Sequence, residues 1–122
     1  MARPPPHEVT DVGPGSTVAA LDDEELALLR LVGEGHVHVK VSAPYRISTQ
    51  YPDYPDARPL HDALVRANPE RLMWGTDWPH PSIAPEIMPD DGHLLDLFHA
   101  WTPDAATRRR ILVDTPARLF LT

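Results

Sequence analysis

The sequence predicts an α/β fold in which helices cover two parallel strands. Three observations support this fold class. Four segments have apolar residues at helical spacing, and two short apolar runs between them are typical of buried strands. The elements follow the order helix, strand, helix, strand, helix, which is the pattern of a parallel sheet with right-handed crossover connections.

The four helices are predicted from their end signals. Acidic residues at 22–25 favour the positive end of the first helix, which Gly33 ends. Thr102 is expected to cap the fourth helix, with Pro103 at its first position. The predicted helices span about 22–33, 59–68, 92–100 and 102–113.

The two strands are predicted at 37–42 and 72–76. In the first strand, Val39 and Val41 share a face that should meet helices, while Lys40 points to the other face. The second run is almost continuously apolar, as in a strand that is covered on both faces.

Composition divides the chain and limits its partners. Residues 1–20 are rich in proline and glycine, which predicts a disordered leader before a folded domain at 21–122. The net charge of −7, with 11 lysines and arginines, argues against a nucleic-acid partner, and Arg108–Arg110 reads as a solvated helix face. No apolar run could span a membrane, and the lack of cysteine excludes thiolate metal ligands and is compatible with a cytoplasmic location.

The most informative segment is 71–81, because its apolar run ends in Asp77 and then in a rigid sequence of Trp, Pro and His. The carboxyl ends of parallel strands carry the ligand-binding and catalytic groups of many α/β proteins. An acid at this position is therefore a candidate functional residue.

Four sequence motifs together resemble the amidohydrolase-related (amidohydrolase 2) family of TIM barrels, in particular its lactonase branch, which includes 2-pyrone-4,6-dicarboxylate hydrolases. The motifs are Lys-Val-Ser-Ala-Pro-Tyr-Arg at 40–46, Asn-Pro-Glu-Arg-Leu at 68–72, Gly-Thr-Asp-Trp-Pro-His at 75–80 and Thr-Pro-Ala-Arg-Leu-Phe at 115–120. The resemblance covers roughly residues 24–120 and implies a partial (β/α)8 barrel, formed by the last two strands and their helices. A complete barrel needs about 250 residues.

The resemblance implies a hydrolase that acts on a cyclic ester (lactone) or a similar carbonyl substrate carrying a carboxylate. Asp77 would be the general base that takes a proton from the attacking water, or a metal ligand where a metal is kept. Arg46 would hold the substrate carboxylate, and Tyr45 would add a directional hydrogen bond. The lactonase interpretation requires no cofactor, whereas other members of the family use a divalent metal such as zinc.

Each of these residues also has a structural interpretation. Asp77 could cap the turn that follows it, and Arg46 could close its loop by pairing with Asp53 or Asp56. His80 could contact Asp77 or substrate, or could simply pack the loop.

His36 and His38 are not expected to bind a metal. Residues two apart on a strand point the same way and could share an ion, but this pair begins its strand. Ser42 lies about 13 Å beyond His38 at roughly 3.3 Å per residue, so the pair belongs at the end of the sheet opposite to the expected site.

A non-catalytic half-barrel is the rival interpretation, because the family's His-x-His strand and its middle-strand histidine have no counterpart in the expected places. Such a remnant or interaction module would be completed by another chain. On either interpretation the open barrel edge is expected to favour self-association. Whether the chain alone is an active enzyme stays open.

Overall fold

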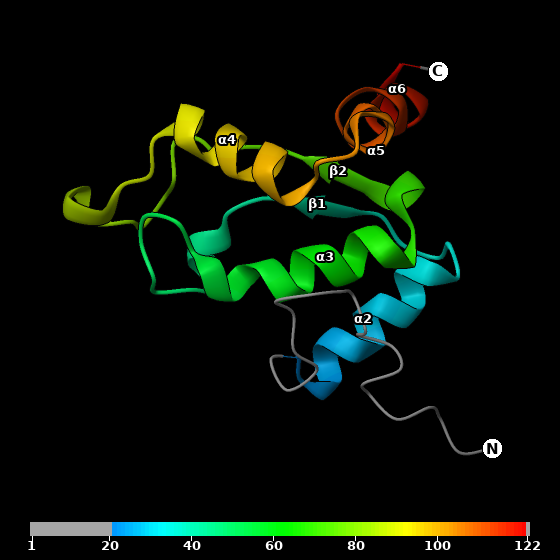
Figure 1. Cartoon of the computed structure of the whole chain (residues 1–122), viewed down its shortest axis with the longest axis horizontal. Helices are drawn as coiled ribbons and strands as arrows, with labels where there is room; N and C mark the ends of the chain where they lie inside the picture. Colours follow the sequence, from blue (N-terminus) through cyan, green and yellow to red (C-terminus); the bar gives the residue numbers. More distant parts are fainter. Residues whose placement is uncertain (1–20, 122) are drawn as a thin grey trace.

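The computed structural model describes residues 21–121, in which two short parallel strands lie side by side (Figure 1). Strand β1 spans Val39–Val41 and strand β2 spans Leu72–Trp74, with Val39 opposite Leu72 and Val41 opposite Trp74. Helix α3, Arg58–Ala67, connects them. The predicted parallel pairing and crossover helix are confirmed, although both strands are shorter than predicted. The predicted leader at 1–20 lies outside the described residues.

The helices begin and end close to the predicted positions. Asp22 caps α2 by accepting from the Glu25 backbone N–H, and Glu25 contacts the Asp22 backbone in return, which satisfies two otherwise unpaired donors. The remaining α-helices are α2 at Asp23–Gly33, α4 at Asp91–Trp101, α5 at Ala105–Arg109 and α6 at Thr115–Phe120, and a π-helical turn at Arg110–Asp114 joins the last two.

The predicted cap at Thr102 is wrong. Thr102 ends α4 instead, and its buried hydroxyl oxygen lies 2.8 Å from Nε2 of His61. The cap of α5 is Asp104, whose carboxylate accepts from the Thr107 backbone N–H at 2.9 Å. A threonine before a proline has the local pattern of a cap, but the long-range partner on α3 engages its side chain.

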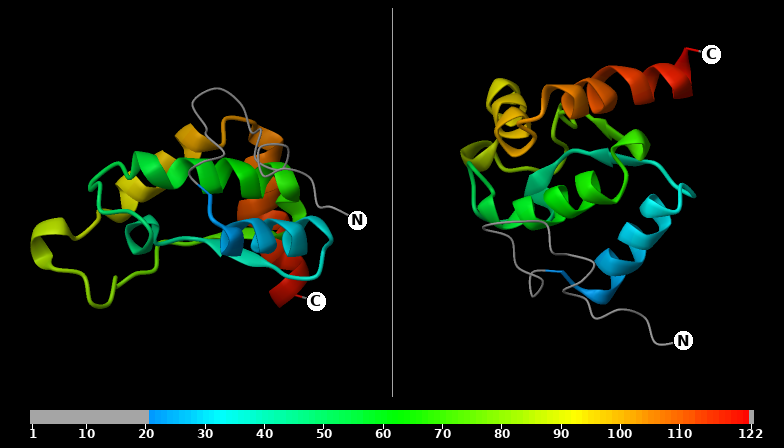
Figure 2. Two further views of the ribbon diagram at one scale, coloured as in Figure 1. Left: turned by 90° about the horizontal axis from the view of Figure 1, so that it is seen from below. Right: turned by 45° about the vertical axis from the view of Figure 1, so that its right-hand side comes forward.

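The hydrophobic core lies between the strand pair and the helices around it. In Figure 1, α2 and α3 are drawn below the strands and α4 to α6 above them, and the view from below in Figure 2 shows α3 and α4 on the same side of the strand pair. These two helices contact each other, with the rings of His61 and Phe98 5.9 Å apart between centroids. Lys40 is exposed, and its stem lies against Gly75 of the neighbouring strand end, where an added Cβ would sit 3.4 Å from Lys40 Cδ. The buried side chains of the main cluster come from several elements: Leu26, Leu29, Val32, Ala63, Leu64, Leu72, Phe98 and Ile111.

Candidate functional site

The carboxyl ends of β1 and β2 meet at one edge of the sheet, as parallel pairing requires. After β1 the chain turns through Ala43 into a short helical turn at Pro44–Arg46, and after β2 it reaches Asp77. Ala43 and Asp77 have φ values of 53° and 62°, in the left-handed region that residues other than glycine seldom adopt. Such conformations are kept where the surrounding structure enforces them, and they cluster at functional sites.

Asp77 is held by two side chains from the other strand end. The Tyr45 hydroxyl donates to Asp77 Oδ2 at 2.6 Å, and Nη2 of Arg46 lies 3.8 Å from the same oxygen. Burial raises the pKa of Tyr45 far above its ordinary value, and the hydrogen bond and charge of Asp77 raise it further. Tyr45 is therefore a neutral hydroxyl that donates its proton. The Asp77 side chain keeps 35% of its surface exposed, so water can reach it.

Arg46 is fixed by its loop without losing access to solvent. Its Nη2 donates to the Pro81 carbonyl at 2.7 Å, and its guanidinium lies 5.4 Å from the centre of the Tyr45 ring. The acids expected as structural partners contact other groups, since Asp53 lies 2.8 Å from His93 Nε2 and Asp56 accepts from the Ser48 hydroxyl. With 46% of its side chain exposed, Arg46 presents a planar cation toward solvent beside Asp77.

His80 is buried, with only 4% of its surface exposed, and both of its ring nitrogens have partners. Nδ1 lies 3.0 Å from the Tyr45 hydroxyl oxygen, and Nε2 lies 2.8 Å from Asp91 Oδ1. Its backbone N–H donates to the Asp77 carbonyl at 2.7 Å. The structure therefore links His80 to the Asp77 carboxylate indirectly, through Tyr45, and not by the direct side-chain hydrogen bond that the sequence offered.

Sequence reasoning missed Asp91, the first residue of α4. An acid in the first turn of a helix usually interacts with the helix dipole, so neither its type nor its position indicates a functional role. The available signal was the spacing, because only ten residues separate His80 from Asp91, and a connection that turns back to the sheet edge can place the first turn of the next helix beside His80.

The described residues do not by themselves fit a zinc site. Zinc in enzymes takes three protein ligands, and no group of three or more His, Cys, Asp or Glu side chains is placed to hold a metal in the described part of the chain. Asp77 contributes one carboxylate and has a guanidinium beside it. Both ring nitrogens of His80 already contact protein groups.

His36 and His38 lie at the amino end of β1, at the opposite end of the sheet from Asp77. His36 Nε2 lies 3.4 Å from the exposed Glu34 carboxylate, and His38 Nε2 lies 3.3 Å from Nη1 of Arg71. The two histidines therefore have separate partners.

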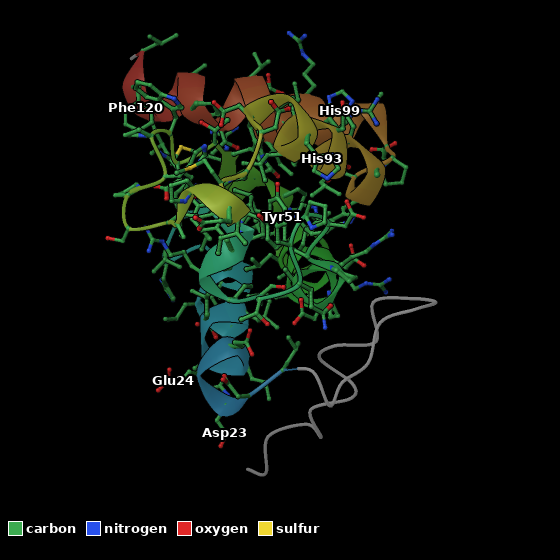
Figure 3. The ribbon with its side chains drawn as sticks, turned by 90° about the vertical axis from the view of Figure 1, so that its left-hand side faces the viewer. Asp23, Glu24, Tyr51, His93, His99 and Phe120 are labelled. Atoms are coloured by element: carbon green, nitrogen blue, oxygen red, sulfur yellow. The ribbon has the colours of Figure 1, made fainter. Side chains whose placement is uncertain are left out.

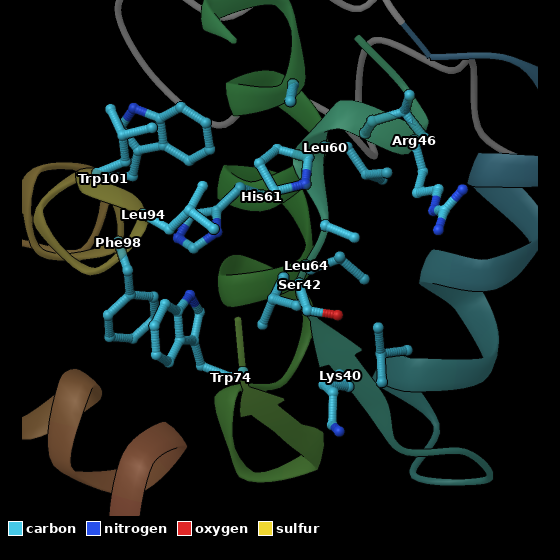
Figure 4. A pocket seen from close by; sticks show the side chains of 18 of the residues that line it. Lys40, Ser42, Arg46, Leu60, His61, Leu64, Trp74, Leu94, Phe98 and Trp101 are labelled. Atoms are coloured by element: carbon cyan, nitrogen blue, oxygen red, sulfur yellow. The ribbon is translucent and has the colours of Figure 1, made fainter. Parts of the chain in front are cut away.

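A cavity of about 210 Å³ lies between the strands and helices α3 and α4 (Figure 4). Arg46 lines one side of it and Trp74, Phe98 and Trp101 line another. His61 also faces it, and burial lowers the pKa of this imidazole from its ordinary 6.5 to about 4. The sequence did not predict this cavity, because it depends on how closely α3 and α4 approach the strands.

Comparison with known proteins decides the family. A family profile described as amidohydrolase matches residues 13–121, nearly the whole sequence. The chain belongs to the amidohydrolase family. The resemblance stated from the four motifs is therefore confirmed.

The relatives of this amidohydrolase chain include enzymes named for lactone substrates. It is 44% identical to a 4-sulfomuconolactone hydrolase of Rhizobium radiobacter, over 85% of this chain and 36% of the relative. It is 37% identical to a 2-pyrone-4,6-dicarboxylate hydrolase of Comamonas testosteroni, over 92% of this chain and 40% of the relative. A D-galactarolactone isomerase of Agrobacterium fabrum is 38% identical over 80% of this chain and 34% of the relative.

Solved structures agree with this assignment. An apo protein of Agrobacterium tumefaciens superposes with a TM-score of 0.72 at 36% identity, covering 84% of this chain and 37% of that one. A Pseudomonas putida protein provisionally described as a 2-pyrone-4,6-dicarboxylic acid hydrolase superposes with a TM-score of 0.61 at 40% identity, covering 76% and 34%. The chain thus spans a little over a third of the length of its relatives. Within residues 21–121, no helix is both long and apolar enough to cross a membrane.

Proposed function

We propose that this chain carries the base and the anion-binding part of a lactone hydrolase site, with Asp77 as general base and Arg46 as the group that binds a substrate carboxylate. The observation that carries the proposal is the placement of an accessible carboxylate 3.8 Å from an accessible guanidinium, at the carboxyl ends of two parallel strands. The names of the relatives support a lactone or a similar carbonyl compound as substrate.

The reaction follows from these two roles. Asp77 takes one proton from water as the water oxygen adds to the lactone carbonyl carbon, and the ring C–O bond then breaks. The departing oxygen takes a proton, which the Asp77 carboxyl can return. Arg46 pairs with the acidic substituent and keeps the carbonyl beside the base.

A group that polarises the carbonyl oxygen is also needed, because most of the rate enhancement in such reactions comes from stabilising the developing oxyanion. On this proposal, that group corresponds to one in the part of the relatives' barrel that lies outside the segment this chain matches. The partial (β/α)8 architecture belongs to the same proposal, supported by the parallel strands, the crossover helix and the two superposed structures.

The direct test is a chimera in which residues 24–120 replace the matching segment of the 4-sulfomuconolactone hydrolase of Rhizobium radiobacter. The folded chimera is expected to hydrolyse acidic lactones, and Asp77→Asn is expected to lower kcat/KM by about 100- to 10,000-fold, the usual contribution of a general base. Asp53→Asn is the matched control, since it removes an acid that pairs with His93. A folded chimera whose turnover ignores Asp77→Asn would refute the assignment of the base.

A non-catalytic module completed by another chain is the second candidate. The described strands form a two-stranded sheet, so each strand has an unpaired outer edge, and Phe120 at the end of α6 is 70% exposed (Figure 3). On both candidates the purified 122-residue chain should self-associate in size-exclusion chromatography and show negligible lactonase turnover. A monodisperse monomer that hydrolyses acidic lactones by itself would contradict both.

A further inference from the structure

Three side-chain contacts connect Asp77 to Asp91, a residue that the proposed reaction does not use. The Tyr45 hydroxyl lies 2.6 Å from Asp77 Oδ2 and 3.0 Å from His80 Nδ1, and His80 Nε2 lies 2.8 Å from Asp91 Oδ1. We propose that Asp91 is a positioning residue for the Asp77 carboxylate and acts on it through His80 and Tyr45. This inference rests on the proposed role of Asp77 as base.

Asp91 affects the Asp77 carboxylate because the three contacts share a limited number of protons. Three contacts need three protons, but one tyrosine hydroxyl and one neutral imidazole supply two. An ionised carboxylate can only accept, so Asp91 requires a proton on His80 Nε2. With both carboxylates ionised, all three contacts are made only when the imidazole carries a proton on Nδ1 as well.

The state of Nδ1 decides where the Tyr45 proton goes. A protonated Nδ1 donates to the Tyr45 oxygen and leaves the hydroxyl proton for Asp77. An unprotonated Nδ1 competes with Asp77 for that proton. The Asp91 carboxylate stabilises the doubly protonated ring by a charge-assisted hydrogen bond, so it directs the hydroxyl proton to Asp77 Oδ2 and leaves Oδ1 to accept from water.

The geometry of the chain of contacts does not depend on Asp91 alone. His80 is buried, its ring packs edge-on against the Tyr45 ring with centroids 5.6 Å apart, and its backbone is bonded to Asp77. The charged side chain on the far side of Tyr45 is Arg46, which is bonded to the Pro81 carbonyl. Removal of Asp91, which is 44% exposed, should therefore change protonation with little change in fold.

The experiment is NMR of the isotope-labelled 122-residue chain at neutral pH, with Asp91→Ser as the variant. Asp90→Ser is the matched control, because it removes the adjacent acid at the start of α4 while a serine can still cap the helix that Asp90 caps through the His93 backbone. The ring nitrogens of His80 report its protons, and the side-chain carboxyl carbon of Asp77 reports its hydrogen bonding.

In the wild-type chain, both His80 nitrogens are expected to carry protons. Asp91→Ser is expected to remove one of them and to shift the Asp77 carboxyl signal, whereas Asp90→Ser leaves both readouts as in the wild type. In a Tyr45→Phe background, Asp91→Ser should no longer shift the Asp77 signal, because the connecting hydroxyl is absent.

A wild-type His80 ring with a single proton, or an Asp77 signal that responds equally to the two serine variants, would overturn the inference. An effect of Asp91→Ser that persists without the Tyr45 hydroxyl would also overturn it. None of these readouts needs turnover, so the inference can fail while Asp77 remains the base, and the hydrolase proposal can fail while the chain of contacts holds.

Discussion

The two ends of the strand pair carry similar side chains but hold them differently. At the carboxyl end, His80 is 4% exposed and contacts Tyr45 and Asp91, which come from two other segments. At the amino end, the His36 side chain is 65% exposed and contacts Glu34, its neighbour two residues earlier. A histidine beside an acid is common on protein surfaces, and exposed pairs contribute little. Burial and partners from distant segments distinguish the carboxyl end as the candidate site.

The backbone shows the same contrast. At the amino end, the positive φ of 82° falls on Gly35, which adopts it without steric cost. At the carboxyl end, Asp77 and His80 adopt φ values of 62° and 59° although both carry side chains. These two unfavourable conformations therefore lie where the polar contacts converge, as expected when a site enforces its geometry.

Buried and exposed histidines should differ most clearly in how they couple stability to pH. His61 is 6% exposed, and its pKa falls from 6.5 to about 4 mainly through burial and secondarily through the positive charge of Arg58. Between these two values, the unfolded chain binds a proton that the folded chain does not. The contribution of His61 to stability is therefore complete above about pH 6.5 and is lost as the pH falls toward about 4, by about 3 kcal/mol.

Urea unfolding of the wild-type chain and of His61→Gln across this pH range measures that loss. The variant is expected to lack most of the pH-dependent part, although it can be less stable at every pH. His93→Gln, at a partly exposed histidine paired with Asp53, is the control substitution. An unchanged slope in His61→Gln would assign the pH dependence to other groups.

The arginines at the two ends provide the next test. In the chimera, Arg46→Gln is expected to raise KM for a carboxylate-bearing lactone by about 10- to 100-fold, the value of a hydrogen-bonded charge pair, and to leave a neutral lactone nearly unaffected. Arg71→Gln, which loses a contact with His38 at the amino end, should change neither value by more than about twofold. Equal effects of the two substitutions on KM would show that the two ends of the strand pair do not differ in substrate binding.

Much of this arrangement could be predicted because it follows from local patterns. Apolar runs at 37–42 and 72–76 locate the strands, and their parallel pairing brings Arg46 and Asp77 together without further information. The resemblance to amidohydrolases supplied the candidate roles. Those roles remain proposals, whereas the family and the parallel strands are established.

The rest could not be predicted because it depends on distances between elements. Thr102 has the local pattern of a helix cap, but its hydroxyl contacts His61 from another helix. Asp91 has the local pattern of an ordinary first-turn acid, but the loop after β2 places its carboxylate against His80. In both cases the side chain could make either a local or a long-range contact, and the packing of α4 determines which one forms.

The smallest expected effect concerns the histidine pair at the amino end, and it is the most direct test of where the site is. His36→Gln and His38→Gln each remove a contact of an exposed side chain, with Glu34 and Arg71 respectively, so each should change the free energy of unfolding by no more than about 0.5 kcal/mol. In the chimera, both variants should retain wild-type kcat/KM on acidic lactones, with or without added zinc, because these residues lie across the sheet from Asp77. Urea unfolding and lactone hydrolysis measure the two quantities. A zinc-dependent loss of activity in either variant would place a metal at the amino end and reverse the comparison between the two ends.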